Sequence, residues 1–134
     1  MLDPYKPTTL MLGRWQPWHE GHTSLFKKAL LETGQVCIQV RKVPKDSDAS
    51  GGRTVTQDDN PFDFETIKKN ISDTLEREGF IQNEDYIIME VPNIVDISYG
   101  RGVGYTFTEH DLGEEIHKIS ATEIRKQLRK DGKI

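Results

Sequence analysis

Short strand-like runs alternate along this chain with stretches whose apolar residues recur at helical spacing. The apolar run Thr8–Gly13 predicts a buried strand, and the next stretch predicts a helix over about residues 22–33 that ends at Gly34. A second strand is predicted at Gln35–Val43. Strands that are separated by helices usually pair in parallel, so the alternation indicates an α/β domain.

The second half of the chain continues this pattern. A second helix is predicted to begin with Asn60 as its N-cap and Pro61 at its first position, followed by an apolar stripe at Phe64, Ile67, Ile71 and Leu75. The later elements are a third strand at Tyr86–Val91, a fourth within residues 93–100, a short fifth at Tyr105–Thr108, and a last helix that a Ser120–Glu123 capping box begins. The whole chain is thus expected to form one three-layer, Rossmann-like domain with a mainly parallel sheet over residues 1–134.

Residues 45–60 interrupt the alternation with a stretch rich in Asp, Ser and Gly. Such a composition predicts a loop without regular structure. A loop of this length in a small domain is more often functional or disordered than incidental, so we expect a mobile loop here.

Charge and composition exclude some classes of protein. A net charge of −4 argues against a protein that coats nucleic acid or an anionic membrane surface. We find no apolar run of the ~18 residues that a membrane span needs, and the proline-broken start of the chain does not resemble a signal peptide. Cys37 is the single cysteine, so no disulfide can form within the chain. We therefore expect a cytoplasmic protein with no nucleic-acid or membrane partner.

The stretch "LGRWQPWHEGHTSLF" follows the first predicted strand and places His19 and His22 three residues apart. A zinc-protease motif needs histidines four apart on a helix face, and nothing in the sequence determines a third ligand. A transition-metal site is therefore disfavoured, and no protein metal ligand is assigned. The two tryptophans would suit a hydrophobic core. A role in the core explains the two histidines less well.

A phosphate-binding turn accounts for more of this stretch. Gly13 would let the backbone turn tightly after the strand, and Gly21 would let a phosphate approach the main chain. The helix that follows offers N–H groups that favour an anion, and two imidazoles can donate hydrogen bonds to phosphate oxygens. The stretch "KISATEIRK" near the other end could form a second anion site through Ser120, Thr122 and Arg125, although helix capping alone explains Ser120.

Taken together, the two stretches resemble the signatures of one family. "GRWQPWHEGH" resembles the His-x-Gly-His signature of the nucleotidyltransferase superfamily, which includes cytidylyltransferases and adenylyltransferases, and "ISATEIR" resembles its Ile-Ser-x-Thr-x-Ile-Arg signature. "NPFDFETI" is similar to a segment of some nicotinamide-mononucleotide adenylyltransferases. The chain also looks like a nucleotidyltransferase-like domain that is fused to adenylylsulfate kinase in some bacteria and phages.

The resemblance implies a reaction. Such enzymes transfer a nucleoside monophosphate from a nucleoside triphosphate to a phosphorylated small-molecule acceptor, release pyrophosphate and form no covalent enzyme intermediate, with Mg²⁺ as cofactor. On this resemblance the catalytic residues are His19, His22 and Arg125, and the residues that bind nucleotide or phosphate are Gly13, Arg14, Trp15, Gly21, Ser120 and Thr122.

Several alternatives stay open at this level. Arg41 and Arg101 are candidate contacts to the second substrate. The nucleotide could be CTP or ATP, and the second possibility includes an enzyme that resembles the nicotinamide-mononucleotide adenylyltransferases. A catalytically inactive nucleotide-binding module of the same fold is the other alternative, and the sequence does not decide whether the chain forms a homo-oligomer.

Overall fold

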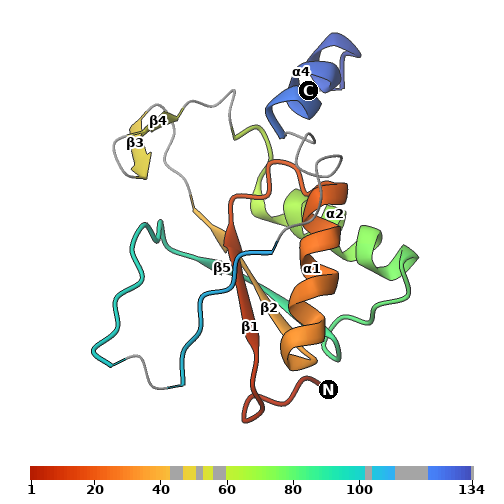
Figure 1. Ribbon diagram of the computed structural model, residues 1–134. Helices are drawn as coiled ribbons and strands as arrows, with labels where there is room; N and C mark the ends of the chain where they lie inside the picture. Colours follow the sequence, from red (N-terminus) through yellow and green to blue (C-terminus); the bar gives the residue numbers. More distant parts are fainter. Residues whose placement is uncertain (43–46, 51–52, 56–59, 102–103, 111–120, 134) are drawn as a thin grey trace.

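The computed structural model describes residues 1–42, 47–50, 53–55, 60–101, 104–110 and 121–133 (Figure 1). Its centre is a parallel sheet in the order β1-β2-β5. The elements that build it are β1 (Thr9–Gly13), α1 (Glu20–Thr33), β2 (Val36–Arg41), α2 (Phe64–Arg77) and β5 (Tyr86–Val91). The predicted α/β class with a parallel sheet is confirmed, as is the predicted strand at Tyr86–Val91.

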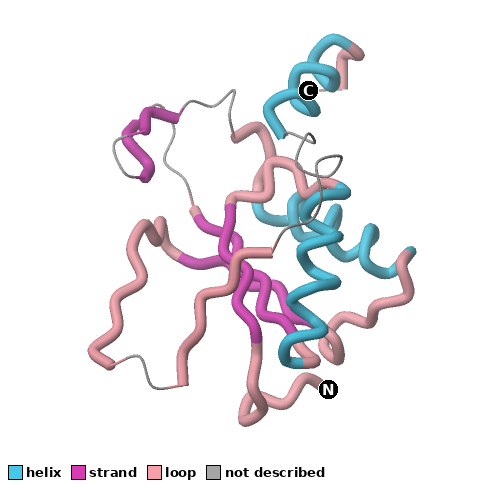
Figure 2. The backbone as a smooth tube through the Cα atoms, viewed as in Figure 1, coloured by secondary structure: helices cyan, strands magenta, loops and turns pink. Residues whose placement is uncertain are grey.

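The register brings the carboxyl ends of all three strands to one edge of the sheet. Gly13 of β1 is paired with Val40 of β2, and Arg41 of β2 is paired with Val91 of β5. Figure 2 shows the three strands side by side, with the chain leaving each of them at the same edge. In open parallel sheets, ligands bind beyond this edge.

The core lies between one face of this sheet and the two helices α1 and α2. Alternate residues of β2 point toward the helices, so Val36, Ile38 and Val40 are buried. They pack in one cluster with Phe26 of α1 and with the stripe of α2 that its spacing predicts, Ile67, Ile71 and Leu75. The opposite face carries Leu10 and Met89, which are 46% and 42% exposed. Within the described ranges, all helical cover of the sheet is therefore on one face.

Two helices begin at other residues than the spacing predicts. Helix α1 begins at Glu20 and not at residue 22, so His19 becomes its N-cap. Helix α2 begins at Phe64 with Asp63 as its N-cap, and not at Asn60, because the Asp63 side chain accepts the Thr66 N–H at 2.9 Å. The side chain of Asn60 is instead engaged by Arg14.

The fourth and fifth predicted strands do not form. Residues 92–100 and 105–110 have no regular secondary structure, and Tyr99 and Phe107 are 55% and 65% exposed. Alternating apolar residues make a strand only where another backbone supplies the ladder of hydrogen bonds, and no ladder to β1 forms along these described residues. The second strand is also shorter than predicted, ending at Arg41.

The stretch predicted as a loop without regular structure contains two short strands. β3 (Ser47–Ser50) and β4 (Arg53–Val55) pair antiparallel with a register shift between Asp48 and Ser50. The prediction was wrong for these residues because a Gly-Gly pair between two runs is a hairpin signal that the loop composition masks. The other residues of the 45–60 stretch, apart from Asn60, lie outside the described ones.

The last described helix, α4 (Ala121–Lys130), lies beyond the carboxyl edge of the sheet, on the side where β1 leads into α1 (Figure 1). It confirms the predicted last helix, although Ser120, its predicted cap, lies outside the described residues. None of the described helices is both long and apolar enough to cross a bilayer.

Candidate functional site

The turn between β1 and α1, residues 14–19, is held by a buried tryptophan. Trp15 has a φ of 55°, in the left-handed region that bulky residues rarely adopt. The residue is 7% exposed, and its indole Nε1–H donates to the Gln39 carbonyl of β2 at 3.0 Å. Packing and this hydrogen bond offset the backbone strain, which is typical of functional turns.

Gly13 makes room for that indole. A Cβ at residue 13 would lie 2.8 Å from Cζ2 of Trp15, and Gly13 is not among the glycines with positive φ. We predicted that Gly13 permits a tight turn. The structure gives a different reason for the glycine, because the tryptophan ring occupies the place of its side chain.

The two histidines cap α1 through their own side chains. Nδ1 of His19, the N-cap, accepts the Gly21 N–H at 3.0 Å, and Nδ1 of His22 accepts the His19 N–H at 3.0 Å. In a neutral imidazole whose Nδ1 is an acceptor, the proton is on Nε2. Both rings therefore present an Nε2–H donor. The rings stack with centroids 3.7 Å apart and an interplanar angle of 22°.

Both imidazoles are held in the neutral form. Burial, with a smaller contribution from the neighbouring His19, lowers the pKa of His22 to about 3. Burial also lowers the pKa of His19. The burial comes from the aromatic core, because His22 meets Trp15 edge-on at 4.8 Å and Trp18 at 5.5 Å between centroids. A proton on either ring would cost desolvation unless an anion compensated it.

Three backbone N–H groups in the first turn of α1 are not available to an anion. Gly21 donates to His19 Nδ1, and both His22 and Thr23 donate to the His19 carbonyl at 2.9 and 3.1 Å. The expectation that free N–H groups of Gly21 and its neighbours bind phosphate is therefore wrong for these three residues in this conformation. Anion recognition at this turn would come from the imidazole Nε2–H groups. Gly21 itself is buried.

Residues 60–70 form hydrogen bonds with the turn between β1 and α1. Arg14 donates to Asn60 Oδ1 at 3.2 Å, and Asn70 donates to the Trp18 carbonyl at 3.4 Å. Between these two contacts, the buried Gln16 pairs with the backbone of Phe62. Sequence reasoning did not single out Gln16. A signal for it was present, since a polar residue between Trp15 and Pro17 has apolar neighbours and needs hydrogen-bond partners where it is buried.

Helix α4 reaches the same turn through Arg125. Arg125 is 3% exposed, and its Nη1 donates to the Gln16 carbonyl at 2.7 Å. The structure thus brings Arg125 to the histidine turn across 109 residues of sequence. Of the other predicted residues in this region, Thr122 is placed in the first turn of α4 by its backbone alone, and Ser120 lies outside the described residues.

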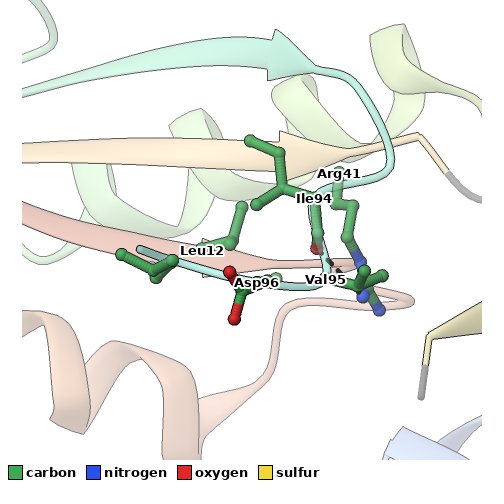
Figure 3. A pocket seen from close by; sticks show the side chains of 7 residues that line it. Leu12, Arg41, Ile94, Val95 and Asp96 are labelled. Carbon is green, nitrogen blue, oxygen red and sulfur yellow. Dashed lines mark hydrogen bonds between the residues drawn. The ribbon is translucent and has the colours of Figure 1, made fainter. Parts of the chain in front are cut away.

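Arg41 lines a separate cavity at the carboxyl edge of the sheet. The cavity has a volume of about 390 Å³ and is bounded by the ends of β1 and β2 and by the segment after β5. Figure 3 shows the Arg41 side chain beside Ile94, Val95 and Asp96, and Arg41 Nη1 donates to the Ile94 carbonyl at 3.4 Å. Gly13 also lines the cavity, so it adjoins the histidine turn.

Arg101 does not share this cavity. It is exposed and lines a larger hollow, about 1440 Å³, along the outer edge of β1. That hollow is bounded by Tyr99, Tyr105 and Phe107 on the one side and by α1 on the other. The two arginines predicted as second-substrate contacts therefore lie at different places.

The described residues supply no ready metal centre. No group of three or more His, Cys, Asp or Glu side chains in this part of the chain is arranged to hold an ion. His19 and His22 each use Nδ1 within the helix cap, which leaves one nitrogen per ring. A Mg²⁺ ion at this turn would depend on oxygens of a substrate and of water, as this hard ion often does.

Comparisons with known proteins show a structural likeness to a solved structure. No family model matches the chain, and no curated protein matches it. Among solved structures, the chain is similar to a bifunctional NMN adenylyltransferase/ADP ribose pyrophosphatase from Francisella tularensis complexed with AMP and a Mn ion, with a TM-score of 0.49 and 24% identity. The match covers 68% of this chain and 23% of that one, so the chain spans about a quarter of the other protein's length.

Proposed function

We propose that this protein is a nucleotidyltransferase that transfers a nucleoside monophosphate from a nucleoside triphosphate to a phosphorylated small-molecule acceptor and releases pyrophosphate. One observation carries the proposal. Two neutral, stacked imidazoles, each with its proton on Nε2, stand at the carboxyl edge of a parallel sheet, next to a helix N-terminus. Such fixed donors favour negative charge that develops on phosphate oxygens.

The chemistry needs no covalent intermediate. An oxygen of the acceptor phosphate attacks the α-phosphorus of the triphosphate, the bond to the bridging oxygen breaks, and pyrophosphate leaves with the electron pair. His19 and His22 donate hydrogen bonds to the triphosphate as charge moves onto the leaving group. They act as fixed donors in a surrounding of low dielectric constant, which the tryptophans provide.

The remaining predicted residues take supporting roles in this proposal. Arg125 contributes positive charge at the turn, and Ser120 and Thr122 at the start of α4 would hold phosphate oxygens, as the resemblance to "ISATEIR" implies. Arg14, Trp15 and Gly21 shape the wall beside the histidines, with Gly13 behind them. Mg²⁺ would arrive with the triphosphate.

The acceptor would occupy the cavity beside Arg41. The guanidinium suits an anionic group, and the Asp96 carboxylate that also lines the cavity suits a hydroxyl donor. Leu12 and Ile94 add apolar surface. A phosphorylated sugar or nucleotide combines these features. Arg101, which lies along the outer edge of β1, would contact substrate only after the segment around it moves.

The test is pyrophosphate release from each of CTP, ATP, GTP and UTP, with Mg²⁺ and a panel of phosphorylated acceptors that includes nicotinamide mononucleotide. Release that depends on both the triphosphate and an acceptor is the expected result, and the productive triphosphate separates a cytidylyltransferase from an adenylyltransferase. A thermal-shift screen with the same triphosphates runs alongside, because a ligand of the folded state raises the melting temperature. Stabilisation without any release identifies a binding module, and the absence of both rejects the proposal.

A further inference from the structure

Gln16 joins three parts of the chain that are far apart in sequence. Its side chain is 6% exposed, and both polar atoms of its amide pair with one residue. Nε2 donates to the Phe62 carbonyl at 3.0 Å, and Oε1 accepts the Phe62 N–H at 3.0 Å. The amide therefore meets Phe62 as a neighbouring strand would. We call this pair the Gln16 clamp.

The backbone of the same residue receives α4. The Gln16 carbonyl accepts the hydrogen bond from Arg125 at 2.7 Å. Residue 16 thus meets the segment before α2 with its side chain and α4 with its main chain. A buried guanidinium and a buried amide would each be costly to leave without partners, so these contacts determine where the turn lies.

The histidines depend on this turn. His19 follows Gln16 by three residues, and its N–H and Nδ1 form the cap that begins α1. A shift of the backbone at residue 16 moves His19 relative to α1, and the cap is the contact that aligns the two rings. Small displacements of donors are costly in phosphoryl transfer, since about 1 Å can lower a rate by about 100-fold.

We propose that Gln16 is a positioning residue for the histidine site, in which the Gln16 clamp holds the turn where His19 and His22 cap α1 and stack, and where Arg125 of α4 binds the Gln16 carbonyl. The proposal rests on the proposed function for its kinetic consequence. Its structural consequence, the state of the two imidazoles, can be measured without any activity.

Gln16→Glu tests the clamp. The substitution keeps the shape of the side chain but places a carboxylate oxygen against the Phe62 carbonyl in place of a donor. Gln82→Glu is the matched control, because Gln82 is a partly buried glutamine whose amide oxygen accepts from Ser72 and which lies just before the amino end of β5, far from the turn. Gln16→Met, which buries no charge, is the second variant if Gln16→Glu does not fold.

Two readouts are made on each folded variant. Nitrogen NMR of the histidine rings should show Nε2–H tautomers for His19 and His22 in the parent protein and in Gln82→Glu. In the Gln16 variants, the tautomers should mix and the His22 titration midpoint should rise toward ordinary values. In the pyrophosphate assay, kcat should fall about 10- to 100-fold with a smaller change in KM for the triphosphate.

The possible results of these two measurements distinguish the positioning role of Gln16 from the proposed function. A folded Gln16 variant with the histidine spectra of the parent protein overturns the positioning role, whatever its activity. Changed spectra in a Gln16 variant, together with no pyrophosphate release by the parent protein, support the positioning role and reject the proposed function. Changed spectra with an undiminished kcat support the positioning role of Gln16 and reject the part that the proposed function gives to the alignment of the two rings.

Discussion

Nδ1 of His22 accepts the backbone N–H of His19 at 3.0 Å, and the His19 ring stacks on the His22 ring at 3.7 Å. The hydrogen bonds that begin α1 therefore also select the tautomer of each imidazole. Most N-caps use Ser, Thr, Asp or Asn, whose side chains are much shorter than that of histidine. A histidine cap leaves Nε2–H directed away from the helix, so one set of contacts both begins the helix and prepares a pair of donors.

Replacing His22 should remove activity while the fold is kept. We expect His22→Asn to lower kcat by about 100- to 1,000-fold, the usual cost of losing one fixed donor to developing charge. The measurement is pyrophosphate release with the productive triphosphate. His110→Asn is the matched control, since His110 lies along the outer edge of β1 and should keep the parent rate. Equal rates for His22→Asn and the parent would remove His22 from the reaction.

The pH dependence of stability should report the buried His22. Its pKa is about 3 in the folded protein and about 6.5 in an unfolded chain, so the unfolded state binds more protons between these values. Stability is complete above pH 6.5 and falls as the pH decreases toward 3, by about 1.4 kcal/mol per unit. Between pH 7 and pH 5, the parent protein should lose about 2 kcal/mol more than His22→Asn.

Urea unfolding at several pH values measures this difference. The two proteins share every other titrating group, His19 included, so the difference between them isolates His22 and its coupling to its neighbour. A parent protein whose stability parallels that of His22→Asn down to pH 5 would mean that His22 is solvated, which contradicts its burial against Trp15 and Trp18.

Local patterns predicted the parts of this fold that local physics determines. The period of Ile67, Ile71 and Leu75 identified the buried face of α2, and the apolar run at Tyr86–Val91 identified β5 with the bounds that the structure has. Position 34 was predicted as the helix stop, and Gly34 has a φ of 86° there. In each of these cases the information lies within a few neighbouring residues.

The sequence-based predictions were wrong or incomplete where residues far apart in the sequence form hydrogen bonds with one another. Asn60 is a good N-cap by composition, but Arg14 engages it from 46 residues away, so Asp63 caps α2 instead. Gln16 was not singled out because its partner Phe62 is equally distant. The motif pair predicted that Arg125 and the histidines belong together, and only the structure shows that the Gln16 carbonyl joins them.

Arg41 should affect the acceptor and not the triphosphate. We expect Arg41→Gln to raise KM for the phosphorylated acceptor by about 10-fold or more, because a charge-assisted hydrogen bond is replaced by a neutral one. KM for the triphosphate should change little. Lys42→Gln is the matched control, since Lys42 is the adjacent cation and forms only an exposed ion pair with Glu90 at 3.5 Å. An equal effect of both substitutions would indicate a general electrostatic effect and not a contact.

Gly13→Ala should destabilise the protein through Trp15. The new methyl group would lie 2.8 Å from Cζ2 of the indole. The indole is held by its hydrogen bond to the Gln39 carbonyl and by its tilted contact with the Trp18 ring, with centroids 4.9 Å apart. Overpacking of this kind typically costs about 1–3 kcal/mol. Gly100→Ala is the control, because nothing lies within 4 Å of a Cβ at residue 100 and its φ is not positive.

A double-mutant cycle identifies the indole as the cause. Trp15→Leu removes the ring atoms that the new methyl group would meet, so Gly13→Ala should cost clearly less in the Trp15→Leu background than in the parent protein. Urea unfolding of the parent, the two single variants and the double variant gives the coupling free energy. If Gly13→Ala costs the same in both backgrounds, the glycine is needed for the backbone itself, as its place at a strand end first suggested, and the close approach of Trp15 is not the reason for it.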